Sequence, residues 1–245
     1  MKILALDSSG LVASVAIVEN ETLIAEYNTQ YKKTHSQTLL PMLDEIKRMI
    51  DLDMTTIDAV ALAAGPGSFT GLRIGSATAK GLGLALDIPL IEVPTLEGLA
   101  YNLYGTQQYV CPIMDARRGQ VYTGIYEFVK ENGKPGSFVM KAIEPQCAVA
   151  IEEIAAKLND LGREVIFLGD GVPVFEEKLA QLMQVEYSFA PAHMNRQRAA
   201  ALAVLGSIYY KEGKAIPAQA HAPIYLRLSQ AERERKEKQE SGEVK

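Results

Sequence analysis

The first 28 residues constrain the fold of this chain more than any other stretch. They hold three short runs of apolar or alternating character, separated by turn-forming residues, at positions 2–7, 12–19 and 22–28. Runs of this length and period predict β-strands, and connections this short place consecutive strands side by side in opposite directions. The chain therefore opens as an antiparallel meander, and other elements have to cover the apolar faces of such a sheet.

The covering elements follow directly along the chain. After residue 28 the hydrophobic period becomes that of a helix, with Ser36 or Thr38 able to cap its start. A buried strand at 57–64, a glycine-rich turn at 65–71, a helix to about residue 86 and a strand at 90–93 complete this part. The predicted order is three strands, helix, strand, helix, strand.

The second half of the chain repeats this order in reduced form. Strands are predicted at 109–115, 119–128, 138–144 and 164–168, with helices at 148–159 and 174–183. The repeat predicts an α/β fold of two duplicated mixed-sheet halves, with an N-terminal domain at 1–103 and a smaller domain at 104–194. A last helix within 195–213 is expected to pack back on the first domain. Residues 228–245 form a charged tail to which we assign no function.

Composition excludes several classes of protein. A net charge of -5 disfavours a chain that grips nucleic acid alone, so contact with RNA is expected only through a complex. Cys111 and Cys147 lack the spacing of a zinc site or a disulfide framework, which favours a reducing compartment. No secretion signal is recognised and no apolar run reaches membrane-spanning length. We therefore expect a cytoplasmic protein that does not contact membranes.

Two loops are candidates for binding a nucleotide or another anion. The first is the turn at Asp7, Ser8 and Ser9, because aspartate-rich hairpins can present backbone amides to phosphates. The second is the glycine loop, whose candidates Gly65, Gly67, Ser68 and Thr70 lie between a strand and a helix N-terminus. An ordinary hairpin turn and a tight turn with an N-cap explain the same residues. The glycine loop lacks the Lys-Ser/Thr ending of a P-loop.

Two helices suggest contact with a partner. The helix after the glycine loop repeats a small residue every fourth position, at Gly71, Gly75, Ala79 and Gly83, which permits close approach of another element. The earlier helix is apolar on more than one side, with candidates Leu39, Leu40, Leu43 and Ile46. A second apolar surface predicts contact with another chain, and packing wholly inside this chain is the alternative.

Several motifs resemble the TsaB (YeaZ-type) family. The similarity runs in order from Met1 to about Ala231 and is carried by 4–9, by His35-Ser36-Gln37, by the run at 65–75 and by Tyr225-Leu226-Arg227. The resemblance implies an actin-like, ribonuclease H-like (ASKHA) fold. It also implies pairing with TsaD, the catalytic relative that transfers threonylcarbamoyl to the adenosine beside the tRNA anticodon, and work with the ATPase TsaE. A homodimer in the absence of TsaD would compete with that pairing.

The resemblance also shows what the chain lacks. TsaD-like enzymes hold a metal with a His-x-x-x-His pair, and Thr95 and Leu99 stand at the matching positions. The three histidines, His35, His193 and His221, are widely spaced, so we predict no metal.

The second-half counterpart of the Asp7 turn is a run of residues 115–119 with Arg117 and Arg118, where glycine is typical of an ATPase of this class. These arginines fit a small anion-binding or RNA-facing spot, or simply a charged hairpin turn. We expect no intrinsic cofactor or activity, with ATP possible only at the partner interface. A free-standing actin-like kinase is the alternative, and a peptidase lacks the required spacing of nucleophile and base.

Overall fold

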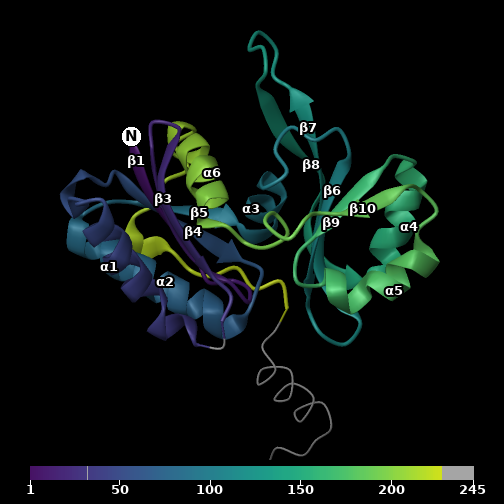
Figure 1. Cartoon of the computed structure of the whole chain (residues 1–245), viewed down its shortest axis with the longest axis horizontal. Helices are drawn as coiled ribbons and strands as arrows, with labels where there is room; N and C mark the ends of the chain where they lie inside the picture. Colours follow the sequence, from purple (N-terminus) through teal and green to yellow (C-terminus); the bar gives the residue numbers. More distant parts are fainter. Residues whose placement is uncertain (32, 228–245) are drawn as a thin grey trace, which may run out of the picture.

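The computed structural model describes residues 1–31 and 33–227, so the predicted charged tail lies outside the described residues. The chain forms two five-stranded sheets with helices around each (Figure 1). The strand orders are β3-β2-β1-β4-β5 and β10-β9-β6-β7-β8, which is the same order read from opposite edges. In each sheet the first three strands are antiparallel, and the fourth runs parallel to the first. The predicted duplication is confirmed.

The element bounds are as follows. The first half comprises β1 (Lys2–Asp7), β2 (Ala13–Glu19), β3 (Thr22–Thr29), α1 (Leu39–Met49), β4 (Ala59–Gly65), α2 (Phe69–Leu86), β5 (Leu90–Pro94) and α3 (Thr95–Tyr101), with short 3₁₀ turns η1 (His35–Gln37) and η2 (Met54–Thr56). The second half comprises β6 (Tyr109–Asp115), β7 (Gln120–Lys130), β8 (Phe138–Ala150), α4 (Ile151–Leu161), β9 (Val165–Leu168), α5 (Val172–Leu182), β10 (Tyr187–Phe189) and α6 (Ala199–Lys211), followed by η3 (Ala218–Ala220).

The structure differs from the sequence prediction at three places. Residues 148–150 extend β8 by pairing with β7, so α4 begins at Ile151 instead of 148. The short elements α3 and β10 were not predicted, because neither is long enough to show a period. The last helix begins at Ala199 instead of 195, since residues 194–196 are held in hydrogen bonds to the end of α3.

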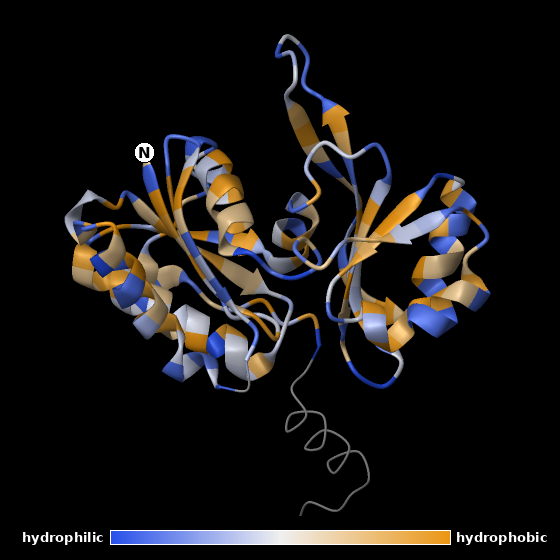
Figure 2. Ribbon diagram, in the orientation of Figure 1, coloured by the Kyte–Doolittle hydropathy of each residue, from blue (hydrophilic) through white to orange (hydrophobic). Residues whose placement is uncertain are grey.

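The strands β1, β2 and β4 of the first sheet are buried on both faces, which explains why they are nearly continuously apolar, whereas the edge strand β3 is largely exposed. One face, with Leu4 and Leu6, packs against α1 and α2. The other, with Ile3 and Ala5, packs against α6. Figure 2 shows the apolar strands inside and the polar sides of the helices outside.

The two halves exchange helices. α6 follows the second sheet in sequence, yet it packs on the first sheet. There Gly206 approaches the strands so closely that a Cβ would lie 2.7 Å from the Ala61 methyl group. α3 follows the first sheet, and its Leu96 and Leu99 share a buried cluster with Val110 and Met114 of the second half. This exchange ties the halves together through their cores. No helix among the described residues is long and apolar enough to cross a bilayer.

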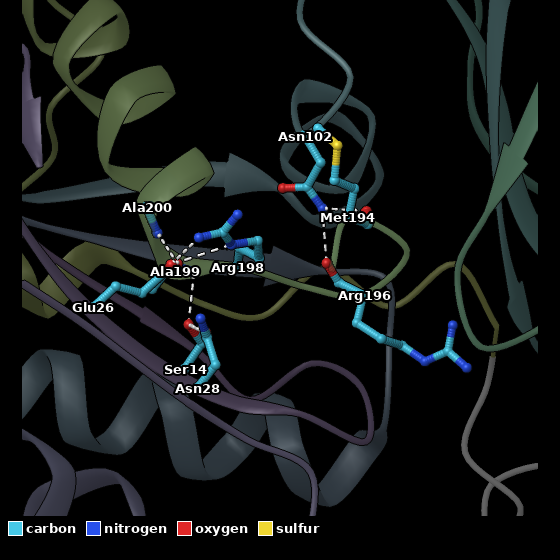
Figure 3. A network of polar contacts seen from close by, with 9 residues as sticks. All are labelled: Ser14, Glu26, Asn28, Asn102, Met194, Arg196, Arg198, Ala199 and Ala200. Carbon is cyan, nitrogen blue, oxygen red and sulfur yellow. Dashed lines mark hydrogen bonds and ion pairs between the residues drawn. The ribbon is translucent and has the colours of Figure 1, made fainter. Parts of the chain in front are cut away.

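The N-terminus of α6 is capped by side chains from the first sheet (Figure 3). The Ala199 amide donates to Ser14 Oγ at 2.7 Å, and the Ala200 amide donates to Glu26 Oε1 at 3.0 Å. Glu26 Oε2 accepts hydrogen bonds from the Arg198 guanidinium, and the Glu26 side chain is only 7% exposed. Helix N-termini leave their first amides unpaired, so these contacts fix where α6 begins on the sheet.

Glu26→Gln should therefore destabilise the protein. The change leaves Arg198 without its carboxylate in a half-buried position, and we expect a loss of about 1–3 kcal/mol in the free energy of unfolding. Glu21→Gln is the matched control, since the Glu21 to Lys211 pair is largely exposed and should matter by at most about 0.5 kcal/mol. Urea unfolding of both variants measures the difference. Equal small losses would contradict the capping role.

Candidate functional site: the cleft between the halves

A cleft of about 550 Å³ lies between the two halves. Its first-half wall is built from the turn after β1 and the loop before α2. Its second-half wall is built from the turn after β6 and from Asp170 at the start of α5. Residues 224–227, after the last helix, also line it. The volume falls in the range of small-molecule sites.

The Asp7 turn is closed on itself. The amide and the hydroxyl of Ser9 both donate to Asp7 Oδ1, at 2.8 and 2.6 Å. Asp7 is 1% exposed, and burial raises its pKa to about 6, although the hydrogen bonds from Ser9 and the nearby His35 act in the opposite direction. Asp7 is therefore a buried acid, and one of its carboxyl oxygens already accepts two hydrogen bonds from within the same turn.

The glycine loop packs directly on this turn. A Cβ at Gly67 would overlap the Ser9 carbonyl oxygen, and one at Gly71 would overlap the Ser8 carbonyl oxygen. The Ser68 amide donates to the Ser9 carbonyl at 2.7 Å. Glycine is required at these positions because the two backbones touch.

The predicted anion-binding residues are thus brought together, but four amides of these two loops are already occupied. The amides of Ser9, Gly65, Ser68 and Gly71 donate to Asp7, Thr95, Ser9 and Ser68 respectively. Thr70 lies exposed in the first turn of α2. A phosphate cradle needs several free amides that converge on one point. In the two candidate loops, four amides are used for hydrogen bonds within the chain instead.

A C-terminal strap, residues 215–227, runs over the first half into the cleft. Its Ile224 amide donates to the Ala64 carbonyl at 2.7 Å. The Tyr225 ring stacks on Phe69, with 4.4 Å between centroids. Arg227 donates from Nη1 to the Ala116 carbonyl on the opposite wall. The strap therefore spans the cleft from one half to the other.

A buried polar cluster anchors the strap, and sequence reasoning missed it. His221 Nε2 lies 2.7 Å from Ser76 Oγ, and His221 Nδ1 lies 2.6 Å from Glu92 Oε1. The Lys80 ammonium donates to the His221 carbonyl at 3.0 Å. The order serine, histidine, carboxylate matches that of a hydrolase triad, which the sequence analysis had excluded by spacing. However, Ser76 and His221 are buried and outside the cleft lining, so the cluster serves to hold the strap.

The positions matched to metal ligands have other roles here. Thr95 Oγ1 accepts the hydrogen bond from the Gly65 amide at 3.2 Å, and Leu99 is 1% exposed in the core that joins the halves. Among residues 1–31 and 33–227, no group of three His, Cys, Asp or Glu side chains is placed to hold a metal ion.

The predicted partner surface needs correction. Leu39, Leu43 and Ile46 of α1 are buried against the first sheet, so they are core residues of this chain. The small residues of α2 also face inward. A Cβ at Gly75 would lie 2.5 Å from Ser8 Oγ, one at Gly83 would lie 2.9 Å from the Ala218 methyl group, and Ala79 is fully buried. The small residues of α2 allow the turn after β1 and the residues around Ala218 to pack closely against this helix. Of the positions assigned to a partner, only Leu40 is exposed.

Two halves of equal strand order, joined by exchanged helices and separated by a cleft, define an actin-like protein of the ribonuclease H-like class. A family model described as "TsaD: tRNA N6-adenosine threonylcarbamoyltransferase" matches residues 22–235. "tRNA threonylcarbamoyladenosine biosynthesis protein TsaB" of Bacillus subtilis is 35% identical, over 95% of this chain and 96% of that protein. The chain belongs to the TsaB family.

Two further proteins agree with this assignment. TsaB of Escherichia coli is 30% identical, over 93% of this chain and 95% of that protein. The solved structure "YeaZ from Pseudomonas aeruginosa" is 27% identical and superposes with a TM-score of 0.76, covering 92% of this chain and 99% of that one. The resemblance inferred from the sequence motifs is confirmed.

Gly71→Ala should destabilise the junction between the loops. The added methyl group meets a backbone carbonyl that cannot move without displacing β1, and we expect a loss of about 1–3 kcal/mol. Gly81→Ala in the same helix has nothing within 4 Å of the new Cβ and should stabilise by up to about 1 kcal/mol. Thermal and urea unfolding compare the two variants. We expect the free energy of unfolding to fall for Gly71→Ala and to rise for Gly81→Ala. A change in the same direction for both variants would show that the contact between Gly71 and the Ser8 carbonyl is not rigid.

Asp7 should make stability fall as the pH rises from 4 to 6. The folded state keeps the Asp7 proton up to about pH 6, whereas the unfolded chain releases it near the ordinary value of 3.8, so the folded state binds more protons in this window. At pH 7 the penalty amounts to about 3 kcal/mol, from two pKa units.

Asp7→Asn should remove this penalty. Its free energy of unfolding, measured in urea at pH 4, 5, 6 and 7, should rise relative to the wild type by about 3 kcal/mol across the series. Ser9→Ala should move the pH range in which stability falls to higher pH, because it removes the hydroxyl hydrogen bond that lowers the Asp7 pKa. Parallel curves for wild type and Asp7→Asn would refute the assignment.

Proposed function

We propose that this chain acts in tRNA threonylcarbamoyladenosine biosynthesis as a non-catalytic subunit that pairs with a TsaD-type catalytic subunit and works with a TsaE-type ATPase. Its family membership supports the pathway. One observation supports the non-catalytic role above others. The two positions that match the metal ligands of TsaD-like enzymes hold Thr95, bonded to the glycine loop, and Leu99, packed in the core.

The geometry of the cleft also supports a non-catalytic role for this chain. ATP hydrolysis in this fold class depends on backbone amides that hold the phosphates. Four amides of the two candidate loops already have partners within the chain, and the strap residues Tyr225 and Arg227 occupy the cleft wall. We therefore assign ATP turnover to the partner proteins, and any nucleotide bound with this chain to the interface with TsaD.

The pairing surface in this proposal is the outer face of α1 and α2. Both helices cover the same face of the first sheet (Figure 1), and both carry exposed apolar residues, Leu40 and Met49 on α1 and Leu84 on α2. Gly81 lies on the same side of α2 with free space around it. A contiguous patch of such groups would mark a contact with another chain, and the variant described below tests whether this face is one. A second copy of the chain would use the same face when TsaD is absent.

Reconstitution tests the proposal. Threonylcarbamoyl transfer to tRNA is measured with TsaD, TsaE, ATP and this chain, omitting each protein in turn. We expect transfer to require this chain, although the chain alone turns over no ATP. Transfer without it, or magnesium-dependent ATP turnover by the chain alone, would favour the free-standing kinase instead.

Leu40→Glu should weaken pairing with TsaD by about tenfold or more, because it places a charge in an apolar contact, a cost of roughly 1.4 kcal/mol or above. Leu161→Glu on α4 of the second half is the matched control, since Leu161 is also an exposed leucine near a helix end. Analytical ultracentrifugation measures both the heterodimer and the homodimer. If the two variants pair equally well, the α1 and α2 face is not the interface.

A further inference from the structure

The tip of the β6–β7 hairpin has an unusual conformation beside the cleft. Three consecutive residues, Arg117, Arg118 and Gly119, have left-handed φ values of 65°, 56° and 71°. Such positions favour glycine, asparagine or aspartate, and arginine there carries a steric cost. The Arg117 amide donates to Asp115 Oδ1 at 2.8 Å, which helps to hold the turn. The turn presents both arginines to solvent, and the Arg117 side chain is 85% exposed.

Other cations gather at the same cleft. Lys33 and Arg227 line it together with Arg117. The Arg73 guanidinium lies 4.2 Å from the centroid of the ring of Phe69, which lines the cleft. Two acids offset part of this charge, since Asp115 pairs with Arg117 at 3.0 Å and Asp170 also lines the cleft. On a chain with a net charge of -5, this is a local concentration of positive groups.

Aromatic side chains lie among these cations, and two of them, Tyr31 and Tyr225, are exposed. Tyr31 is 71% exposed, and Tyr225 and Tyr122 also line the cleft. Leu11 adds an exposed apolar surface at the rim. Aromatic rings interleaved with Lys and Arg are the combination that binds single-stranded nucleic acid, with bases stacked on rings and phosphates held by cations.

We propose that the rim of this cleft, formed by Tyr31, Lys33, Arg117, Arg118, Tyr225 and Arg227, binds a single-stranded segment of RNA. The inference rests on the proposed function in that the RNA is the tRNA substrate. A free nucleoside triphosphate fits less well, because four of the loop amides that could hold its phosphates already donate hydrogen bonds within the chain. The exposed cations and rings instead lie along the rim, where an extended strand reaches them.

The double variant Arg117→Asn, Arg118→Gly tests the site. It removes two cations and installs residues that favour the left-handed conformation, so a purely structural turn should gain stability and lose nothing else. The matched control is Lys130→Asn, Lys141→Asn, which removes two exposed lysines of β7 and β8 outside the cleft lining. Labelled tRNA is titrated with the assembled complex over a series of salt concentrations.

We expect the arginine variant to melt no lower than the wild type, yet to bind tRNA at least fivefold more weakly. Its slope of log affinity against log salt should be smaller by roughly 1.4 when both arginines contact phosphates, since each phosphate contact to single-stranded nucleic acid contributes about 0.7. Affinity and slope equal to those of the lysine control would overturn the proposal. The proposal would also be overturned if ATP displaced the bound tRNA and if this displacement depended on the same arginines.

Failure of this inference can be told apart from failure of the proposed function. The same titration with the isolated chain and ultraviolet crosslinking to the RNA do not depend on TsaD. If the complex does not form but the isolated chain crosslinks RNA through the β6–β7 turn, the RNA site stands and the pairing fails. If the complex forms and transfers threonylcarbamoyl while the arginine variant has unchanged affinity for tRNA, the pairing stands and the RNA site fails.

Discussion

The contact between two backbones, the turn after β1 and the loop before α2, organises the first half and the cleft. Gly67 and Gly71 lack side chains at the points where the Ser8 and Ser9 carbonyls approach, and the Ser68 amide bonds to one of them. This contact fixes α2 on the sheet. It also consumes amides that an actin-like ATPase would offer to phosphates, so the same geometry that stabilises the fold weakens the nucleotide site.

The halves are joined by more than one connection. α3 and α6 each pack on the sheet of the other half, and α6 starts where Glu26 and Ser14 satisfy its first amides. The strap adds a third link, with His221 anchored between Ser76 and Glu92 and Arg227 bonded across the cleft. The cleft walls are therefore held by contacts on several sides, which favours a platform for partners over a site that opens and closes around a substrate.

Much of the fold was predictable, because long strands and helices carry a clear period. Both sheets, α1, α2 and the last helix followed from that pattern. The short elements α3 and β10 did not, and the start of α4 was placed too early because residues 148–150 extend β8. The sequence did not predict that the two candidate loops touch. It also assigned the small-residue face of α2 to a partner, although Ala79 and Gly83 face this chain's own β5 and strap.

The sequence by itself determined the order of the longer elements, the family and the absence of a histidine pair, because each depends on residue types at short spacing. Only the tertiary structure decided which face of a helix is inside and which donors remain free. Ser76 and His221 are 145 residues apart, and Ile224 closes over Gly65 from the far end of the chain. Contacts between such distant residues follow from how the layers pack, and no local pattern encodes them.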